Sequence, residues 1–235
     1  MGKIIIIKNN KGGVGKTFLT AQLGTGLAAQ DKRTLILTSD SQNNILDYLY
    51  QGFDSHEFDK GLKAEVNKKG DGEKFKLRDN LYFIPLESNR FSSVFIEKLP
   101  LYLDDIKKEY DYILIDSVPT LKIDQCFLEL ADKVIIPLQA NAVNVTSTIQ
   151  FLKELNNDSK VAAIIINQFS KTAIKMKYKE VLETALAGKI PMLEPINNLA
   201  FIDRMLDRRK SIWEYNSVEA QSIQINLFNL INLIQ

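Results

Sequence analysis

The feature that most constrains this chain is a glycine-rich loop between an apolar run and a helical pattern, close to the start of the sequence. Residues 4–7 are consecutive isoleucines, which predict a buried strand. The loop after them contains Gly12, Gly13 and Gly15, and a helical pattern begins at about Lys16. Glycines allow backbone N–H groups to surround an anion, and a helix N-terminus adds partial positive charge. The sequence therefore predicts a phosphate-binding loop.

The side chains of this loop suit a nucleoside triphosphate with a magnesium ion. Lys16 can reach the β- and γ-phosphates, and the Thr17 hydroxyl can ligate Mg²⁺. The usual pattern has a glycine five residues before the Gly-Lys pair, where this chain has Asn10. A second lysine, Lys11, stands at the front of the loop instead. The cofactors that we expect are ATP and Mg²⁺.

The run from Lys11 to Thr17 resembles the deviant phosphate loop of the ParA/MinD family of ATPases. The resemblance implies that Lys11 crosses a dimer interface to the nucleotide of the partner subunit. It also implies that Lys11 and Lys16 are catalytic, since they would offset phosphate charge in the transition state. The plain alternative, a glycine-rich turn with two solvated lysines, is disfavoured by the flanking strand and helix. The nucleotide-binding residues implied in this loop are Lys11, Gly12, Gly13, Val14, Gly15, Lys16, Thr17 and Phe18.

A carboxylate follows the next predicted strand. Residues 34–38 form a buried run, and Asp40 lies just past its end, where α/β sheets bind ligands. This segment is similar to the family's first switch, Asp-x-Asp-Pro-Gln, although Thr38 and Ser41 replace the first aspartate and the proline. The similarity implies that Asp40 is catalytic, lies near the γ-phosphate and Mg²⁺, and helps to position the attacking water. The alternative is a turn aspartate that caps the following helix.

Another apolar strand, over residues 110–116, ends in Asp116. An aspartate in that place supplies the second half of the Mg²⁺ site in nucleoside triphosphatases. Asp116 and Pro119 resemble the family's second switch, Asp-x-x-Pro, and we expect Asp116 to hold the metal through water. The predicted metal-binding residues are therefore Thr17, Asp40 and Asp116.

Candidates for contacts to the adenine base lie further along the chain. Residues 161–166 form a buried strand that ends at Asn167, whose amide offers both a donor and an acceptor. By resemblance Asn167, Pro195 and Asn197 are the candidate base-contacting residues. The alternative for each is a turn residue beside a strand.

Strands alternate with helices along the whole chain, which predicts an α/β fold with a mostly parallel central sheet flanked by helices. We expect residues 1–235 to form a single P-loop NTPase domain. A helix is predicted over residues 91–110, with Pro100 kinking or splitting it. The charge run over residues 68–76 is interpreted as a solvated loop, and His56 as a loop residue.

Composition excludes several classes of protein. The formal net charge is +1, so a polyanionic partner must be bound by a local patch. Cys126 is the one cysteine, which rules out an internal disulfide and the two cluster cysteines that an iron protein of the nitrogenase type needs. We find neither a signal-peptide pattern nor an apolar run long enough to span a membrane. The expected location is the cytoplasm.

Two basic clusters could supply a local patch for DNA. The tentative DNA-binding residues are Lys171, Lys175, Lys177, Arg204, Arg208, Arg209 and Lys210. Lysine and arginine bind phosphates without regard to sequence. The alternative is that these residues only keep the surface soluble.

The resemblance as a whole implies a ParA-type partition ATPase of the short form, without an N-terminal helix-turn-helix. Such a protein forms a homodimer around ATP and binds DNA non-specifically, so it is nucleoid-associated when ATP-bound. A centromere-binding partner protein then stimulates hydrolysis and releases it. The alternatives are a membrane-associated ATPase of the MinD kind and a cargo-positioning ATPase. No stable membrane association is expected, because the apolar pattern of residues 223–234 lacks basic residues and suits a core-packed closing helix.

Overall fold

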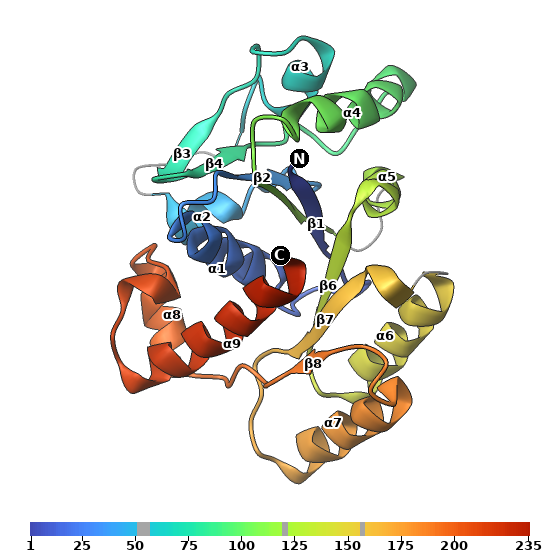
Figure 1. The fold of residues 1–235 in the computed structure, drawn as a ribbon, viewed down its shortest axis with the longest axis vertical. Coiled ribbons are helices and arrows are strands. Elements are labelled where there is room, and N and C mark those ends of the chain that lie inside the picture. Colours follow the sequence, from blue (N-terminus) through green and yellow to red (C-terminus); the bar gives the residue numbers. More distant parts are fainter. Residues whose placement is uncertain (51–56, 119–121, 156–157) are drawn as a thin grey trace.

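The computed structural model describes residues 1–50, 57–118, 122–155 and 158–235, so that His56 and Pro119 lie outside the described residues. Helices cover both faces of one central sheet (Figure 1). The strands are β1 Lys3–Ile7, β2 Thr34–Thr38, β3 Phe75–Arg78, β4 Leu81–Ile84, β5 Tyr112–Asp116, β6 Lys133–Leu138, β7 Val161–Ile166 and β8 Met192–Leu193. The helices are α1 Lys16–Ala28, α2 Ile45–Leu49, α3 Leu62–Asn67, α4 Ser93–Ile106, α5 Lys122–Leu130, α6 Ala142–Glu154, α7 Ala173–Leu186, α8 Ala200–Asp207 and α9 Val218–Ile234, with 3₁₀ turns at Asp158–Lys160 and Ile212–Glu214.

The eight strands lie in the order β3-β4-β2-β5-β1-β6-β7-β8. All neighbouring pairs are parallel except β3 with β4, which confirms the prediction of a mostly parallel sheet flanked by helices. The order reverses at β1, and α/β sheets bind ligands outside the carboxyl ends of the strands at such a point. There the register pairs Ile7 with Asp116 and Thr38 with Asp116. The loops after β1, β2 and β5 therefore converge.

Two hydrophobic cores fill the space between the sheet and its helices. Along β1, Ile4 and Ile6 pack in one core with residues of α4, α5 and α7, whereas Ile5 and Ile7 pack in the other with residues of α1, α2 and α9. This alternation follows from the two-residue period of a strand. Because both faces are covered, the inner strands are apolar without interruption. That is why the sequence shows runs of isoleucine.

Two predictions about the first half of the chain differ in part from the structure. Pro100 does not split its helix, because α4 continues through it and keeps Phe95, Leu99 and Leu103 buried against the sheet. The charge run does not remain a loop throughout, since Lys76 lies on the edge strand β3 with its side chain exposed. Lysines on an edge strand discourage pairing with another chain, and this explains a charged sequence within a strand.

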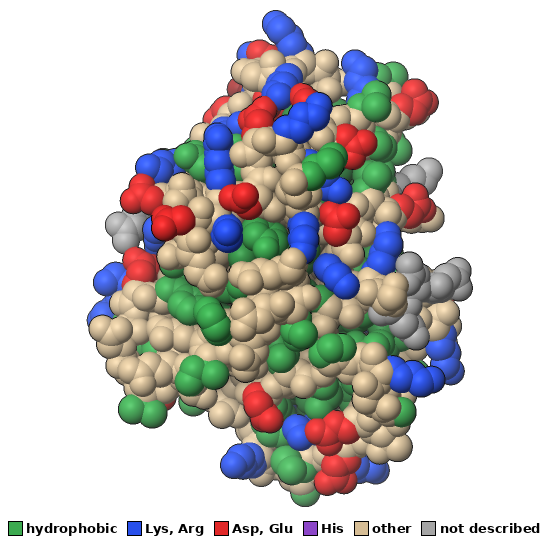
Figure 2. Space-filling view, viewed as in Figure 1, with side chains coloured by type: hydrophobic (Ala, Val, Ile, Leu, Met, Phe, Trp, Pro, Cys, Tyr) green, Lys and Arg blue, Asp and Glu red, His purple; other side chains and the backbone are tan. Residues whose placement is uncertain are grey.

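The closing helix α9 packs on the core as predicted, and the apolar side chains expected to face the core are all buried: Ile223, Leu227, Leu230, Ile231 and Ile234. Its outer face is uncharged apart from Glu219 near the start, and the chain has no lysine or arginine after Lys210. Figure 2 shows uncharged polar and hydrophobic side chains over this region, with the charged side chains gathered above it and around the edges. In the described part of the chain, no helix is long and apolar enough to cross a membrane.

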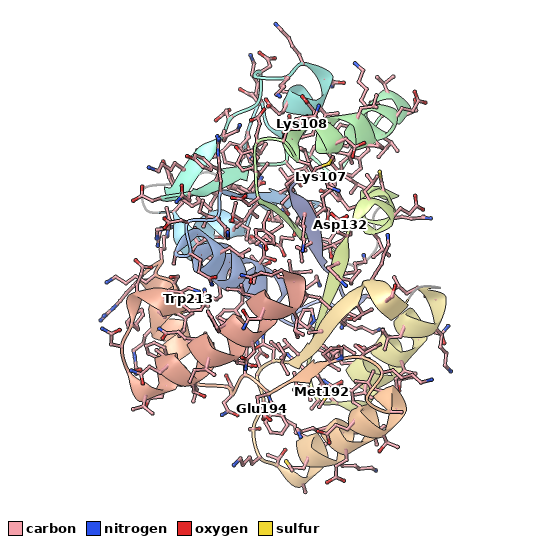
Figure 3. The ribbon with its side chains drawn as sticks, viewed as in Figure 1. Lys107, Lys108, Asp132, Met192, Glu194 and Trp213 are labelled. Atoms are coloured by element: carbon pink, nitrogen blue, oxygen red, sulfur yellow. The ribbon has the colours of Figure 1, made fainter. Side chains whose placement is uncertain are left out.

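A close contact joins α1 to the 3₁₀ turn that precedes α9. The Trp213 indole donates a hydrogen bond to the Gln22 carbonyl (2.8 Å), and its ring covers Gly26. A Cβ on Gly26 would lie 2.6 Å from that ring. Trp213, labelled in Figure 3, extends from the 3₁₀ turn toward α1. The glycine is therefore needed here for close packing.

We expect Gly26→Ala to destabilise the protein, although alanine favours a helix by about 1 kcal/mol. Overpacking costs about 1–3 kcal/mol, which leaves a net loss of about 1 kcal/mol at the middle of that range. The melting temperature should therefore fall by about 2–4 °C. Thermal denaturation followed by circular dichroism would measure it. Gly24→Ala is the control, because its Cβ would meet only side-chain methyls, at 3.0 Å or more. A melting temperature that rises in both variants would contradict the proposed contact.

Candidate active site

The loop after β1 has the backbone that an anion-binding loop requires. Gly13 and Gly15 have positive φ angles of 71° and 90°, a conformation that glycine adopts without strain. Gly15 is also the N-cap of α1. A side chain there would overlap with the amide of Asn167, which donates a hydrogen bond to the Val14 carbonyl (3.2 Å). The loop is thus shaped by its own glycines and by the end of β7.

Lys16 lies at the first position of α1 and is only 8% exposed. Its ammonium donates a hydrogen bond to the Lys11 carbonyl (2.8 Å), which holds it over the loop. Burial lowers the pKa of Lys16, and the Asp116 carboxylate opposes that effect. A partly desolvated ammonium interacts more strongly with phosphate than one in water does.

Asp116 and Thr17 lie together, as the sequence predicts. The Thr17 hydroxyl donates a hydrogen bond to Asp116 Oδ2 (2.9 Å), and Thr20 approaches the other oxygen at 3.5 Å. Burial raises the pKa of Asp116 to about 7, against the effects of the Thr17 hydrogen bond and the Lys16 charge. A hydroxyl beside a carboxylate is the donor set that Mg²⁺ uses together with phosphate oxygens and water. In the described ranges no three His, Cys, Asp or Glu side chains group to hold a metal.

Thr38, which stands where the family has an aspartate, links the two carboxylate loops. Its hydroxyl donates a hydrogen bond to the Asp116 carbonyl (3.2 Å) and accepts one from the Asp40 N–H (3.0 Å). An aspartate in the place of Thr38 could not donate the hydrogen bond to the Asp116 carbonyl, because a carboxylate accepts hydrogen bonds but cannot donate one. Asp40 Oδ1 accepts a hydrogen bond from the Gln42 N–H (3.0 Å), so hydrogen bonds fix the turn both at Asp40 and at Gln42. Asp40 is half-buried, and its charge acts on both Lys16 and Asp116.

These loops line a single cavity of about 420 Å³. The predicted site residues that line it are Gly12, Gly13, Gly15, Lys16, Thr17, Phe18, Asp40, Asp116, Asn167 and Asn197. The volume is that of an ordinary small-molecule site. Phosphate-loop, metal and base candidates from five separate stretches of sequence thus meet around one space.

Other predicted site residues do not line this cavity. Val14 is fully buried beneath the loop, and Lys11 contributes its carbonyl to Lys16. Pro195 lines a separate hollow beside α9, together with Val218 and Ile223. Pro195 is therefore not part of the wall of the nucleotide cavity, whereas Asn197 lines both the cavity and this hollow.

The basic candidates also lie outside the cavity, and Lys175 and Arg209 among them donate hydrogen bonds to backbone carbonyls. Lys175 donates a hydrogen bond to the Gln168 carbonyl (2.6 Å), and Arg209 donates one to the Tyr50 carbonyl. The exposed members of the two clusters are Lys171, Lys177, Arg204, Arg208 and Lys210.

Several lining residues were missed by the sequence reasoning: Asn44, Tyr48, Gln168, Asn198, Ile202, Asp203 and Leu206. Tyr48 lies close enough to Asp116 that the carboxylate charge adds to burial in raising its pKa. Tyr48 belongs to the short helix α2 after Asp40, Asn44 is the N-cap of that helix, and Asn198 adjoins Asn197, so their position in sequence was a usable signal. Asp203 lies on α8 and had no such signal.

We expect Asp40→Ala to lower the rate of ATP hydrolysis at least about 100-fold, the usual effect of losing a group that positions or activates the nucleophile. ATP affinity should stay within about threefold, because a residue acting on the attacking water contributes little to ground-state binding. Single-turnover hydrolysis and equilibrium titration would separate the two quantities. Asp104→Ala, which removes an exposed carboxylate on α4, is the control. Hydrolysis at the wild-type rate would remove Asp40 from the mechanism.

Comparison with known proteins agrees with this geometry. A family model described as an AAA domain matches residues 2–168. The chain is 31% identical to the sporulation initiation inhibitor protein Soj of Bacillus subtilis, over 81% of this chain and 82% of Soj. It is 27% identical to the septum site-determining protein MinD of Buchnera aphidicola, over 76% of this chain and 68% of that protein. A complex of Cyanothece McdA with ATP has the same fold, with a TM-score of 0.82 at 16% identity over 99% of this chain and 96% of that one.

Proposed function

Because this chain belongs to the ParA/MinD family of P-loop ATPases, we propose that it is a DNA-partition ATPase in which residues 1–235 form one nucleotide-switched domain. It dimerises around ATP and Mg²⁺, binds DNA non-specifically as a dimer, and is released when a centromere-binding partner protein stimulates hydrolysis. The observation that carries this proposal is the meeting of Lys16, Thr17, Asp40 and Asp116 at one cavity beneath a loop whose front residue is a second lysine.

The residues divide the work of the reaction as follows. The loop N–H groups and Lys16 bind the β- and γ-phosphates, and their charge stabilises negative charge that develops in the transition state. Thr17 and Asp116 would hold Mg²⁺, which would neutralise phosphate charge. Asp40 orients the attacking water. Asn167 and Asn197, which also line the cavity, would contact the adenine base.

The proposed link between nucleotide and DNA runs through α8. One side of this helix lines the cavity with Ile202, Asp203 and Leu206, while Arg204 on the same helix is exposed. A nucleotide that packs against α8 would fix the position of its basic residues. A dimer doubles the number of phosphates that such residues contact. The logarithm of the affinity falls linearly with the logarithm of the salt concentration, and the slope is proportional to that number. The ATP-bound dimer would therefore be nucleoid-associated.

We expect binding to random-sequence DNA with ATP but not with ADP or without nucleotide, measured by fluorescence anisotropy. The affinity should fall steeply with salt concentration. Arg204→Glu and Lys177→Glu test the two basic clusters separately, and Lys98→Glu, an exposed lysine on α4, is the control. Equal binding in all three nucleotide states would contradict a switch. Unchanged binding in both cluster variants would move the DNA surface elsewhere.

A second candidate is a MinD-like membrane-associated or cargo-positioning ATPase, which the similarity to MinD of Buchnera aphidicola supports. The same ATPase core would serve it, so the nucleotide site does not discriminate between the two. The uncharged outer face of α9 favours the first candidate, because interfacial helices use basic residues to bind anionic lipid. Co-sedimentation with anionic vesicles in the presence of ATP would favour the second.

A further inference from the structure

Behind the phosphate loop lies a set of buried polar residues that the mechanism above does not use. Lys8, Ser39 and Asp124 are 5%, 0% and 1% exposed. They come from three places: the residue after β1, the residue after β2 and the first turn of α5. Buried polar groups are costly unless they are bonded, so the contacts of these side chains are informative.

The contacts converge on the backbone of one residue, Val118. The Ser39 hydroxyl donates a hydrogen bond to Asp124 Oδ1 (2.7 Å) and accepts one from the Val118 N–H (2.9 Å). The Lys8 ammonium donates a hydrogen bond to the Val118 carbonyl (3.0 Å). The N–H and the carbonyl of Val118 are therefore both hydrogen-bonded to buried side chains of this set. Val118 lines the nucleotide cavity two residues after Asp116.

The same contacts also fix the other carboxylate loop. Ser39 immediately precedes Asp40, and its N–H donates a hydrogen bond to the Asp116 carbonyl (3.1 Å). A shift of the Ser39 hydroxyl would thus move both Asp40 and Val118. One side chain connects the two loops that carry the proposed water-positioning and metal-holding groups.

The charges of Lys8 and Asp124 compensate each other. Burial lowers the pKa of Lys8, and the Asp124 carboxylate opposes this shift. An apolar pair of similar volume is often at least as stable as a buried charge pair, so stability alone gives little reason to keep one. A charge pair that sets the position of a reacting loop affects the reaction rate instead, because small displacements at a reaction centre lower the rate strongly.

We propose that Lys8, Ser39 and Asp124 are positioning residues for ATP hydrolysis, which fix the Val118 backbone and the Ser39–Asp40 turn and thereby set the relative position of Asp40 and Asp116. This inference rests on the proposed roles of those two carboxylates. None of the three residues lines the nucleotide cavity. They act on the turnover rate and leave ATP affinity nearly unchanged.

The first test is Ser39→Ala, which removes one hydroxyl from a small buried residue. Exchange of the Val118 amide hydrogen, followed by NMR without nucleotide, should become roughly five- to tenfold faster, the effect of losing one hydrogen bond. The turnover number should fall about tenfold, while ATP affinity stays within about twofold. The control is Thr34→Val, which removes a fully buried hydroxyl at the opposite end of β2. Unchanged amide exchange and unchanged turnover in Ser39→Ala would overturn the proposal.

The second test separates position from stability. Lys8→Met should lower the melting temperature, because the Asp124 carboxylate loses its compensating charge. Lys8→Met combined with Asp124→Leu should restore the melting temperature but leave turnover at least about tenfold below wild type. Wild-type turnover in that folded double variant would show that the cluster is merely structural. If Asp40→Ala hydrolyses normally, the proposed catalytic role fails, whereas the Val118 exchange still reports on the cluster by itself.

Discussion

Lys16→Ala is expected to weaken ATP binding at least about 100-fold while the protein stays folded. Lys16 is the first residue of α1 and follows a loop with two glycines in the left-handed conformation. Burial of its ammonium lowers its pKa. A hydrogen bond to a charged group contributes about 1.5–3 kcal/mol, and Lys16 can bond both the β- and the γ-phosphate. A loss of about 3 kcal/mol corresponds to a factor of about 100.

Titration calorimetry with ATP and Mg²⁺ would measure this loss, and circular dichroism would verify folding. Lys177→Ala, an exposed lysine on α7, is the matched control and should bind ATP like wild type. Retained affinity in Lys16→Ala would mean that the glycine loop does not bind the phosphates, and the assignment of the cavity would fall with it.

Lys11→Ala should leave ATP binding within about threefold of wild type but prevent ATP-dependent dimerisation. Within one subunit Lys11 supports Lys16 through its backbone carbonyl, which the substitution keeps. Its ammonium makes no hydrogen bond or ion pair with any residue in the described part of the chain. An ammonium at the front of the loop can form charge-assisted hydrogen bonds to the phosphates of a partner subunit across an interface.

Size-exclusion chromatography with light scattering would follow dimerisation, and a parallel titration would measure ATP affinity. Lys98→Ala, which removes an exposed lysine on α4, should dimerise normally and serves as the control. A Lys11→Ala protein that still dimerises with ATP would show that the front lysine is dispensable for assembly. Lost ATP affinity would instead show that Lys11 acts within its own subunit.

The sequence predicted the central part of the molecule well because its signals there are local. The apolar runs of β1 and β2 give the strands, and the glycines mark the loop between β1 and α1. Since parallel strands end at the same edge of a sheet, Asp40 and Asp116 could be expected to meet near Lys16. The charges acting on Lys16 come from both of these carboxylates, as that reasoning requires.

The parts that sequence reasoning missed depend on contacts between distant residues. Helix α3 begins at Leu62 because Glu87 accepts hydrogen bonds from the N–H groups of Gly61, Lys63 and Ala64. Because the capping residue Glu87 is distant in sequence from α3, the residues next to the helix show no capping pattern. The same holds for Lys8 and Asp124, which neither lie near each other in sequence nor match a motif. Their pairing is a property of the folded sheet.

Nucleotide-controlled assembly can be measured as the molar mass of the wild-type protein in solution with Mg²⁺ and ATP, with Mg²⁺ and ADP, and without nucleotide. One chain has a mass of 26.7 kDa. We expect this mass without nucleotide and with ADP, and twice this mass with ATP while hydrolysis is slow. A protein that binds ATP but keeps the mass of one chain in all three states would contradict the claim that this site controls assembly.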